Sequence, residues 1–464
     1  MMVASIALPW AAGMLWVLAL SGPVRFGLPL AAGYGFFLGL LASTLVLRGL
    51  DAIGLDWSLP PALAALALLA GTGGWMAWRR GAWPPAVGGT VASSGAYRVA
   101  FWLLLGLGVV RLAMLGYEAM VLPLVPLDTW SQWASKSRVW YEYRGLVPFV
   151  EPGAWLQRPG VLQFTDSHPG YPATLPLVQV WSALWLGRWN ESLVNGAWPA
   201  GYVALGLGFY AQVRRLDLAP LPALFCTYAL LSLPFLTIYV ALAGLADLFI
   251  AAAFGLAAAS LWLWTISRRR DDLVLAVAMA VLCASLKREG LLWDATLVLT
   301  VLMARDRRLG IGALGIGLAF VLGYLVFGPS ELAVADYFIY TRARNVMPYV
   351  LEHFLVMDNW HLLWYAVVGV VAWHWRLALR PRVAPASIAM LGALLLIGLL
   401  YTFTSLAIGV MEESVTNRLP FEMVPALAFY LVLVLAEKQR LAAPEDALSR
   451  QAFAGASAEP AAMG

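Results

Sequence analysis

The sequence is poor in charge, and lysine is nearly absent from it. Charged residues make up 12% of the 464 residues, whereas a soluble domain has about 25%. Lysine occurs only as Lys136, Lys287 and Lys438, among 30 basic residues in all. Because half the charge of a water-facing surface is missing, a soluble enzyme is excluded. No basic run is typical of a nucleic-acid surface, so we expect no nucleic-acid partner.

Cysteine and histidine are scarce too. Cys226 and Cys283 both lie inside apolar runs, which excludes the disulfide framework of a secreted scaffold. The four histidines show no H-x-x-x-H spacing, which argues against a zinc site.

Apolar runs dominate instead, with 62% hydrophobic residues and a mean hydropathy of +0.78. A helix needs about 20 apolar residues to cross the bilayer core. We therefore predict an all-α polytopic membrane protein with about 13 transmembrane helices. They are expected at 5–21, 27–47, 59–77, 98–116, 194–212, 220–238, 243–266, 272–286, 289–303, 310–328, 360–377, 385–405 and 420–436.

Basic residues orient these segments. If the helices alternate in direction, most arginines fall on one side, which the positive-inside rule makes cytoplasmic. The N-terminus is then outside and the C-terminus inside. The residues on the cytoplasmic side are Arg25, Arg79, Arg80, Arg98, Arg214, Arg215, Arg268, Arg269, Arg270, Arg305, Arg307, Arg308, Arg376, Arg380, Arg382, Lys438 and Arg440.

Two long segments, 117–193 and 329–359, face outside in this scheme. The apolar stretch from Tyr171 to Gly187 is interrupted by Pro172 and Pro176, so we predict an interfacial helix there rather than a span. The tail 437–464 is rich in Ala, Gly, Ser and Pro, and we predict that it is a disordered cytoplasmic end.

The first polar group on the outer side is Pro126 to Lys136. Helical spacing places Asp128, Gln132 and Lys136 on one polar stripe, with Trp130, Trp133 and Trp140 on another face. One interpretation is that Asp128 caps a helix and that the tryptophans form an interfacial belt. The other is that the polar stripe carries chemistry.

Two further groups of outward-facing charges stand out, because such residues are rare in membrane proteins. Asp166 and His168 lie in a proline-braced turn. One interpretation is that they perform acid–base chemistry or bind a polar ligand, and the other is that Asp166 simply bonds the turn's own backbone. Lys287, Arg288 and Glu289 lie between two short spans. A Glu–Lys or Glu–Arg pair leaves one cation over, which suggests an anionic ligand such as a phosphate.

Other outward-facing candidates are Asp247, Arg342, Arg344 and Arg418.

Together the motifs follow a recognisable order: Asp-x-Trp and Trp-x-x-Lys (128–136), His-Pro-x-Tyr-Pro (168–172), Gly-x-Ala-Asp-Leu (244–248), Lys-x-Glu-Gly (287–290) and Arg-Leu followed by Pro (418–425). This order resembles the membrane-embedded GT-C glycosyltransferases, the group of protein O-mannosyltransferases and lipid A aminoarabinose transferases. The resemblance covers 98–436, and it leaves residues 1–97 as a three-helix segment without an assigned role.

The resemblance implies a transferase of the bacterial inner membrane and cell envelope. It would move a hexose or pentose from a polyprenyl-phosphate donor to a hydroxyl of a lipid, glycan or protein acceptor at the periplasmic face. Asp128 would be the general base of an inverting reaction, while Lys287, Arg288 and Arg418 would bind the donor phosphate. The residues expected to bind or orient substrate are Trp130, Lys136, Asp166, His168, Tyr171, Asp247, Glu289, Arg342 and Arg344. Metal dependence varies in this superfamily; because the first loop has no Asp-x-Asp pair, no obligatory cofactor is expected, and a divalent cation bound by Asp166 and His168 stays open.

Two alternatives remain open. A transporter or flippase for an anionic, amphipathic lipid-linked substrate would use the same cations as a binding pocket. Its expected signs are charges near mid-membrane and broken helices, and this sequence has Arg111 within a span and little else at that depth. A non-catalytic assembly subunit is the third interpretation.

Overall fold

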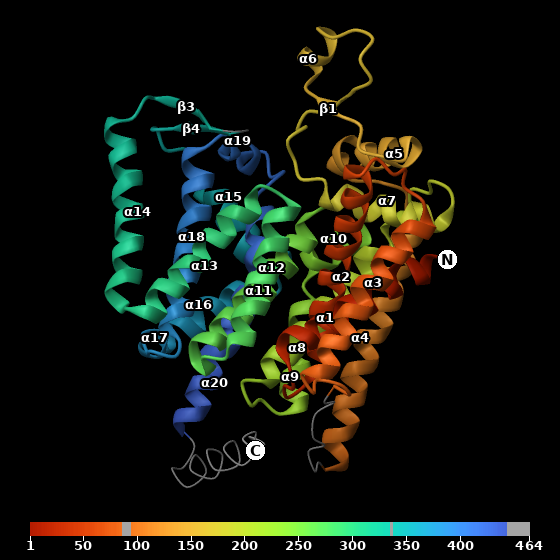
Figure 1. Ribbon diagram of the computed structural model, residues 1–464. Helices are drawn as coiled ribbons and strands as arrows, with labels where there is room; N and C mark the ends of the chain where they lie inside the picture. The colour runs from red at the N-terminus through yellow and green to blue at the C-terminus, as the bar shows by residue number, and fades with distance from the viewer. Residues whose placement is uncertain (86–93, 335–336, 443–464) are drawn as a thin grey trace.

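The computed structural model describes residues 1–85, 94–334 and 337–442, which are mostly helical (Figure 1). Helices dominate because a helix satisfies its backbone hydrogen bonds internally, as hydrocarbon surroundings require. The helices are α1 (Met2–Ser21), α2 (Gly27–Ala52), α3 (Leu59–Arg79), α4 (Gly95–Val121), α5 (Ala134–Tyr143), α6 (Pro152–Leu156), α7 (Thr174–Leu186), α8 (Ala197–Arg214), α9 (Pro220–Leu231), α10 (Pro234–Ala241), α11 (Asp247–Ser267), α12 (Arg270–Leu286), α13 (Glu289–Arg305), α14 (Arg307–Phe327), α15 (Met347–Leu351), α16 (Leu363–Trp373), α17 (Trp375–Ala378), α18 (Ala384–Phe403), α19 (Leu406–Met411) and α20 (Arg418–Ala442).

Short elements complete the chain. Strands β1 (Phe149–Val150) and β2 (Phe164–Thr165) pair in parallel, and β3 (Glu331–Val334) and β4 (Tyr337–Tyr340) pair antiparallel. Three helical turns are η1 (Thr129–Trp133), η2 (Leu193–Asn195) and η3 (Glu352–Val356).

The chain is a helical, polytopic membrane protein. Within the described ranges, eight helices are long and apolar enough to cross a membrane, or nine if the bent pair α9 and α10 forms one span. Each of the 13 predicted segments coincides with a helix or a pair of helices, but α8, α12, α13 and α16 do not qualify as spans on length and composition. The number 13 therefore stays a prediction.

Two predicted spans are not continuous helices, and one predicted boundary is wrong. The segment 220–238 is broken, because α10 starts anew at Pro234 with a bend of 64° relative to α9; proline has no N–H to continue the helix before it. The segment 360–377 is divided between α16 and α17. The predicted disordered tail begins too early, since α20 continues to Ala442, while 443–464 lie outside the described residues.

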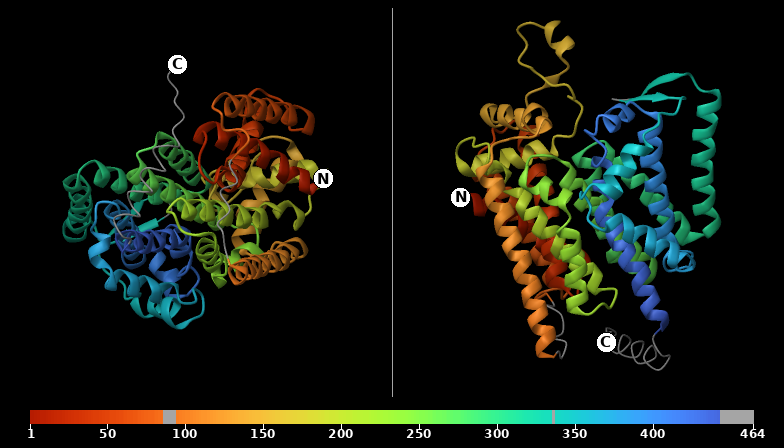
Figure 2. Two further views of the ribbon diagram at one scale, coloured as in Figure 1. Left: turned by 90° about the horizontal axis from the view of Figure 1, so that it is seen from below. Right: turned by 180° about the vertical axis from the view of Figure 1, so that it is seen from behind.

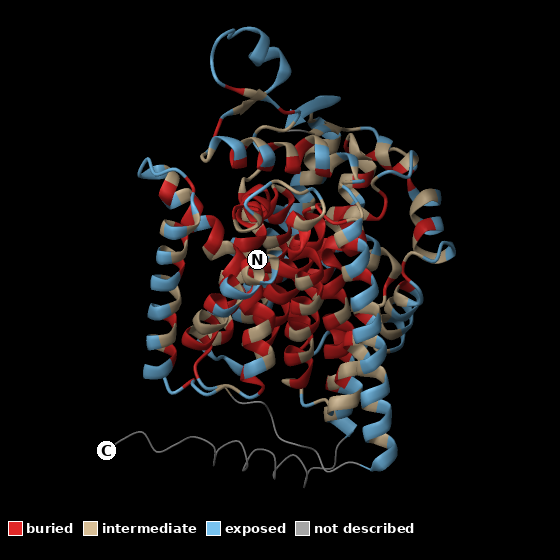
Figure 3. Cartoon of the chain, turned by 90° about the vertical axis from the view of Figure 1, so that its right-hand side faces the viewer, coloured by how far each residue is buried: buried red, intermediate tan, exposed pale blue. Residues whose placement is uncertain are grey.

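The interior is formed around α11 and α20, which are buried along most of their length. By contrast, α4 and α14 are exposed to the surroundings along nearly all of theirs, and such apolar, exposed helices fit contact with lipid. Figure 3 shows this contrast between a buried centre and exposed peripheral helices. The N-terminal helices and the C-terminal helices form two halves of the bundle (Figure 2).

The basic loops lie together at one end of the bundle, as the alternation of spans predicts. We call this the basic end and the opposite end, where α5 and α7 lie, the site end (Figure 1). Contacts that connect these loops are Arg25–Asp217 (3.2 Å), Arg80–Asp271 (3.0 Å), Arg215–Asp272 (2.6 Å), Arg382–Glu437 (3.3 Å) and the bond from Arg268 to the carbonyl of Ala304 (3.0 Å).

The loop 117–193 folds across the site end. Its helix α7 matches the predicted interfacial helix in position, but its predicted environment is wrong. All residues from Thr174 to Leu184 are buried, so α7 packs against protein on every side instead of presenting one face to lipid.

Candidate functional site

A pocket of about 250 Å³ opens at the site end. Segments far apart in the chain converge on it, from the turn η1 to the start of α20. Its lining residues are Asp128, Gln132, Trp133, His168, Tyr171, Lys287, Glu289, Tyr337, Tyr401, Leu406, Val415, Arg418 and Leu419.

Asp128 faces this pocket and is held there by Arg418. The Nη1 atom of Arg418 donates to Oδ2 of Asp128 at 2.8 Å. The same guanidinium contacts both carboxylate oxygens of Asp247 at 3.3 Å through Nε and Nη2. Asp128 directly precedes η1, yet its side chain makes no capping hydrogen bond. The capping interpretation of Asp128 therefore loses its main support.

Lys287 lies deeper and is surrounded by carboxylates. Its Nζ is 3.0 Å from Glu289, 3.8 Å from Glu422 and 3.9 Å from Asp247. Burial acts to lower the pKa of Lys287, but these three carboxylates outweigh it and raise that pKa well above its ordinary value. Lys287 is therefore a fixed positive charge. It has carboxylate partners, so it is not the left-over cation expected in the turn between α12 and α13.

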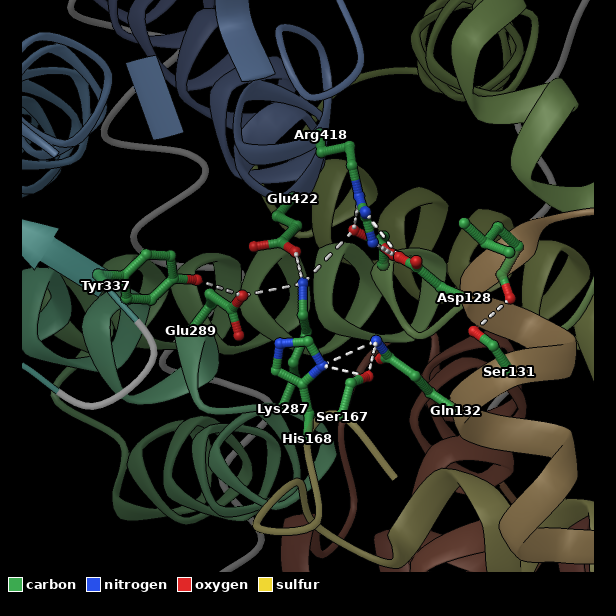
Figure 4. Close-up of polar contacts among 12 residues, drawn as sticks. Asp128, Ser131, Gln132, Ser167, His168, Lys287, Glu289, Tyr337, Arg418 and Glu422 are labelled. Atoms are coloured by element: carbon green, nitrogen blue, oxygen red, sulfur yellow. Dashed lines mark hydrogen bonds and ion pairs between the residues drawn. The ribbon is translucent and has the colours of Figure 1, made fainter. Parts of the chain in front are cut away.

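Two neighbours complete the deep part of the site. The Tyr337 hydroxyl donates to Oε1 of Glu289 at 2.9 Å (Figure 4). Nε1 of Trp293 donates to Oε2 of Glu422 at 2.5 Å. Burial, and then the Glu289 carboxylate, raise the pKa of the Tyr337 hydroxyl. Tyr337 therefore remains a hydrogen-bond donor at ordinary pH.

His168 forms the opposite wall of the pocket. Its Nδ1 lies 2.9 Å from Nε2 of Gln132 and 3.0 Å from Oγ of Ser167 (Figure 4). The ring of Tyr171 stacks on His168 at 5.1 Å and on Trp133 at 5.4 Å. These contacts orient the imidazole toward the pocket.

Lys136 and Asp166 lie behind this wall and form a buried ion pair. Lys136 Nζ also donates to the carbonyl of His168 at 2.9 Å, and Asp166 accepts from the His168 amide at 3.1 Å. Burial lowers the pKa of Lys136, while Asp166 opposes this shift. The pair therefore supports the turn that presents His168, in agreement with the backbone-bonding interpretation of Asp166.

Two glycines of the sequence motifs, Gly244 and Gly290, allow the segments around the pocket to pack closely against one another. Gly244 precedes Asp247, has a φ of +111°, and a Cβ there would overlap Thr129 of η1. A Cβ at Gly290 would overlap the carbonyl of Cys283 in α12. The first glycine brings the Asp247 segment against the Asp128 segment, and the second lets α12 and α13 pack closely beside Lys287.

The site has more acids than bases. We use the name charge network for six residues: Asp128, Asp247, Glu289, Glu422, Lys287 and Arg418. Because four carboxyl groups face two cations, the charge network suits acceptance or retention of a proton better than simple capture of an anion. Among the described residues, no three His, Cys, Asp or Glu side chains converge on a metal position.

The structure divides the predicted site residues into two sets. Asp128, His168, Tyr171, Lys287, Glu289 and Arg418 line the pocket, and Asp247 adjoins it through Arg418. Away from the lining are Trp130, Lys136, Asp166, Arg288, Arg342 and Arg344.

Members of the second set differ in position. Trp130 is half exposed and does not line the pocket, so it alone of the three tryptophans fits the predicted belt; Trp133 and Trp140 are buried. Arg288 lies over the Tyr171 ring at 5.7 Å. Arg344 lies over the Tyr340 ring at 5.1 Å.

Sequence reasoning missed Glu422, Tyr337, Tyr401 and Trp293. For Glu422 a signal existed, since an ionisable residue inside an apolar span is a functional candidate by default. The tyrosines and Trp293 carry no comparable signal, because aromatic residues are common at such positions. No protein-family model, curated protein or solved structure matches the chain.

Proposed function

We propose that the chain is an integral-membrane glycosyltransferase that moves a sugar from a polyprenyl-phosphate donor to an acceptor hydroxyl, with the site end facing the periplasm. The observation that carries the proposal is the position of Asp128. Its carboxylate is held by Arg418 at 2.8 Å, its side chain is 30% exposed, and it lines the pocket without capping a helix.

In this mechanism Asp128 acts as the general base. Arg418 engages Oδ2 of Asp128, so Oδ1 remains to accept the proton of an acceptor hydroxyl as that hydroxyl attacks the anomeric carbon. The bond from the anomeric carbon to the phosphate oxygen breaks in the same step, and the phosphate leaves with its electron pair.

The cations of the pocket would stabilise the leaving phosphate. A guanidinium has five N–H donors, and Asp128 and Asp247 occupy three donor atoms of Arg418 through one N–H each. Lys287 makes one close contact and two longer ones, so its charge is shared among partners. Arg418 therefore keeps two N–H groups for a phosphate oxygen, whereas the carboxylates around Lys287 weaken the attraction of Lys287 for a phosphate.

The test compares Asp128→Asn with Asp358→Asn, an acid whose side chain is 77% exposed and which pairs with His361. Binding of a long-chain polyprenyl phosphate and sugar transfer from polyprenyl-phosphate hexoses and pentoses are measured separately. General-base catalysis is worth about 10²–10⁴-fold in rate. We expect Asp128→Asn to bind the lipid normally and lose transfer by about that factor, with Asp358→Asn unchanged. Substantial transfer by Asp128→Asn would remove Asp128 from this role.

A flippase for the same class of lipid is the second candidate, and one observation favours it. Helices α9 and α10 are broken at Ser232–Leu233, and Arg111, from within α4, donates to the Ser232 carbonyl at 2.9 Å. Broken helices and buried charges are typical of transporters. Translocation of a fluorescent polyprenyl phosphate can be measured with the protein reconstituted in vesicles. Equal translocation by the unaltered chain and by Asp128→Asn would favour this candidate over the transferase.

A further inference from the structure

A second polar pocket, of about 280 Å³, lies at the basic end, away from the charge network. Arginines from three separate segments line it: Arg215 follows α8, Arg382 precedes α18, and Arg440 lies in the last turn of α20. This arginine pocket also has an apolar wall that includes Leu263 and Leu433.

The arginine pocket has an excess of positive charge. Glu437 is the shared partner of two arginines, with both oxygens at 2.8 Å from Arg440 and one at 3.3 Å from Arg382. Arg215 pairs with Asp272 at 2.6 Å, and the lining residue Asp217 pairs with Arg25 at 3.2 Å. One guanidinium charge is thus left over between Arg382 and Arg440, whose side chains are 44% and 36% exposed. Guanidinium groups match phosphate oxygens in geometry as well as charge.

An apolar groove of about 830 Å³ joins the arginine pocket. It lies between α4, α9 and α20, and it shares Ala436 and Gln439 with the arginine pocket. Toward the site end it continues into an apolar cavity of about 440 Å³, which shares Phe225 and Val432 with the groove. A cationic pocket at one end of a long apolar groove has the polarity of an anionic lipid.

We propose that the arginine pocket and the groove together bind a glycerophospholipid with an anionic phosphodiester headgroup, of the phosphatidylglycerol class, from the leaflet at the basic end. The headgroup phosphate contacts Arg382 and Arg440, and an acyl chain fills the groove between α4, α9 and α20. The excess positive charge favours an anionic headgroup. Because the arginine pocket is continuous with the groove at Ala436 and Gln439, the site favours a lipid over a free anion. This site does not depend on the proposed transferase activity.

The first experiment uses the purified full chain in neutral detergent and measures binding of phosphatidylglycerol, phosphatidylcholine and inorganic phosphate by native mass spectrometry and titration. A basic residue near a membrane surface is worth about five-fold in affinity for an anionic lipid. We expect phosphatidylglycerol to bind about five-fold or more tightly than phosphatidylcholine. Arg382→Gln should remove about five-fold of that affinity, and it leaves Glu437 paired with Arg440.

The matched control is Arg308→Gln, an exposed arginine at the same end that does not line the arginine pocket; it should bind phosphatidylglycerol as the unaltered chain does. Ala436→Phe fills the junction without removing a charge and should weaken binding of both lipids. Equal affinities of Arg382→Gln and Arg308→Gln for phosphatidylglycerol would overturn the proposal. So would equal binding of the two lipids by the unaltered chain, or inorganic phosphate that binds as tightly as phosphatidylglycerol.

Discussion

At the scale of single residues, the candidate site consists of buried charges that compensate one another. Lys287 is 8% exposed, and three carboxylates lie within 3.9 Å of its Nζ. Removing one partner of a buried ion pair leaves an uncompensated charge, which costs about 3–5 kcal/mol. Lys287 is therefore a structural centre of the charge network as well as a candidate for phosphate binding.

This role predicts the effect of Lys287→Met. We expect a loss of about 3–5 kcal/mol in the free energy of unfolding, measured by thermal or denaturant unfolding in detergent. Lys438→Met, at an exposed position of α20, is the matched control and should change stability by less than about 0.5 kcal/mol. Adding Glu422→Gln to Lys287→Met should recover part of the loss, because one buried charge is removed. A Lys287→Met chain as stable as Lys438→Met would contradict this account.

At the scale of elements, the site is assembled by close approaches between turns and helix ends. The turn before α11 contacts η1 through Gly244, and this contact places Asp247 and Asp128 on the same guanidinium. A β-carbon at Gly244 would face two penalties, the strain of its positive φ and the overlap with Thr129. The motif glycine is thus required by the position of η1.

The corresponding prediction compares Gly244→Ala with Gly54→Ala. Both glycines have positive φ, +111° and +73°, but Gly54 has nothing within 4 Å of an added Cβ. Backbone strain alone costs about 1–2 kcal/mol, so Gly54→Ala should lower unfolding stability by about that amount. Gly244→Ala should cost about 1–3 kcal/mol more and also abolish transfer, because η1 and Asp128 must shift. Equal effects of the two changes on stability and transfer would show that the contact with η1 is unimportant.

At the scale of the whole molecule, charge is sorted between the two ends of the bundle. The basic end carries the ion pairs between loops, and the site end carries the charge network (Figure 4). The positive-inside rule predicts that the basic end faces the cytoplasm, and the proposed function accordingly puts the pocket at the periplasmic surface.

This orientation is tested by labelling single cysteines after replacing Cys226 and Cys283 with alanine. Trp130→Cys, at a half-exposed position two residues after the pocket residue Asp128, should react with a membrane-impermeant maleimide in intact spheroplasts. Arg308→Cys, at an exposed position of the basic end, should react only after permeabilisation. The reverse pattern would invert the proposed topology and move the pocket to the cytoplasmic face.

The sequence by itself determined the helical membrane class and the collection of basic loops at one end. It also indicated that Asp128, His168, Lys287 and Arg418 belong to one site. These features follow from composition and from the direction in which consecutive helices run, which are properties of local segments.

Only the tertiary structure decided which charges meet. Asp128 and Arg418 are 290 positions apart, and no local pattern specifies that pair or the position of Glu422 beside Lys287. The burial of α7 from Thr174 to Leu184 also depends on the segments packed around it. Side-chain partners across a helix bundle are set by packing between distant segments, and hydropathy and spacing along the chain carry no information about that packing.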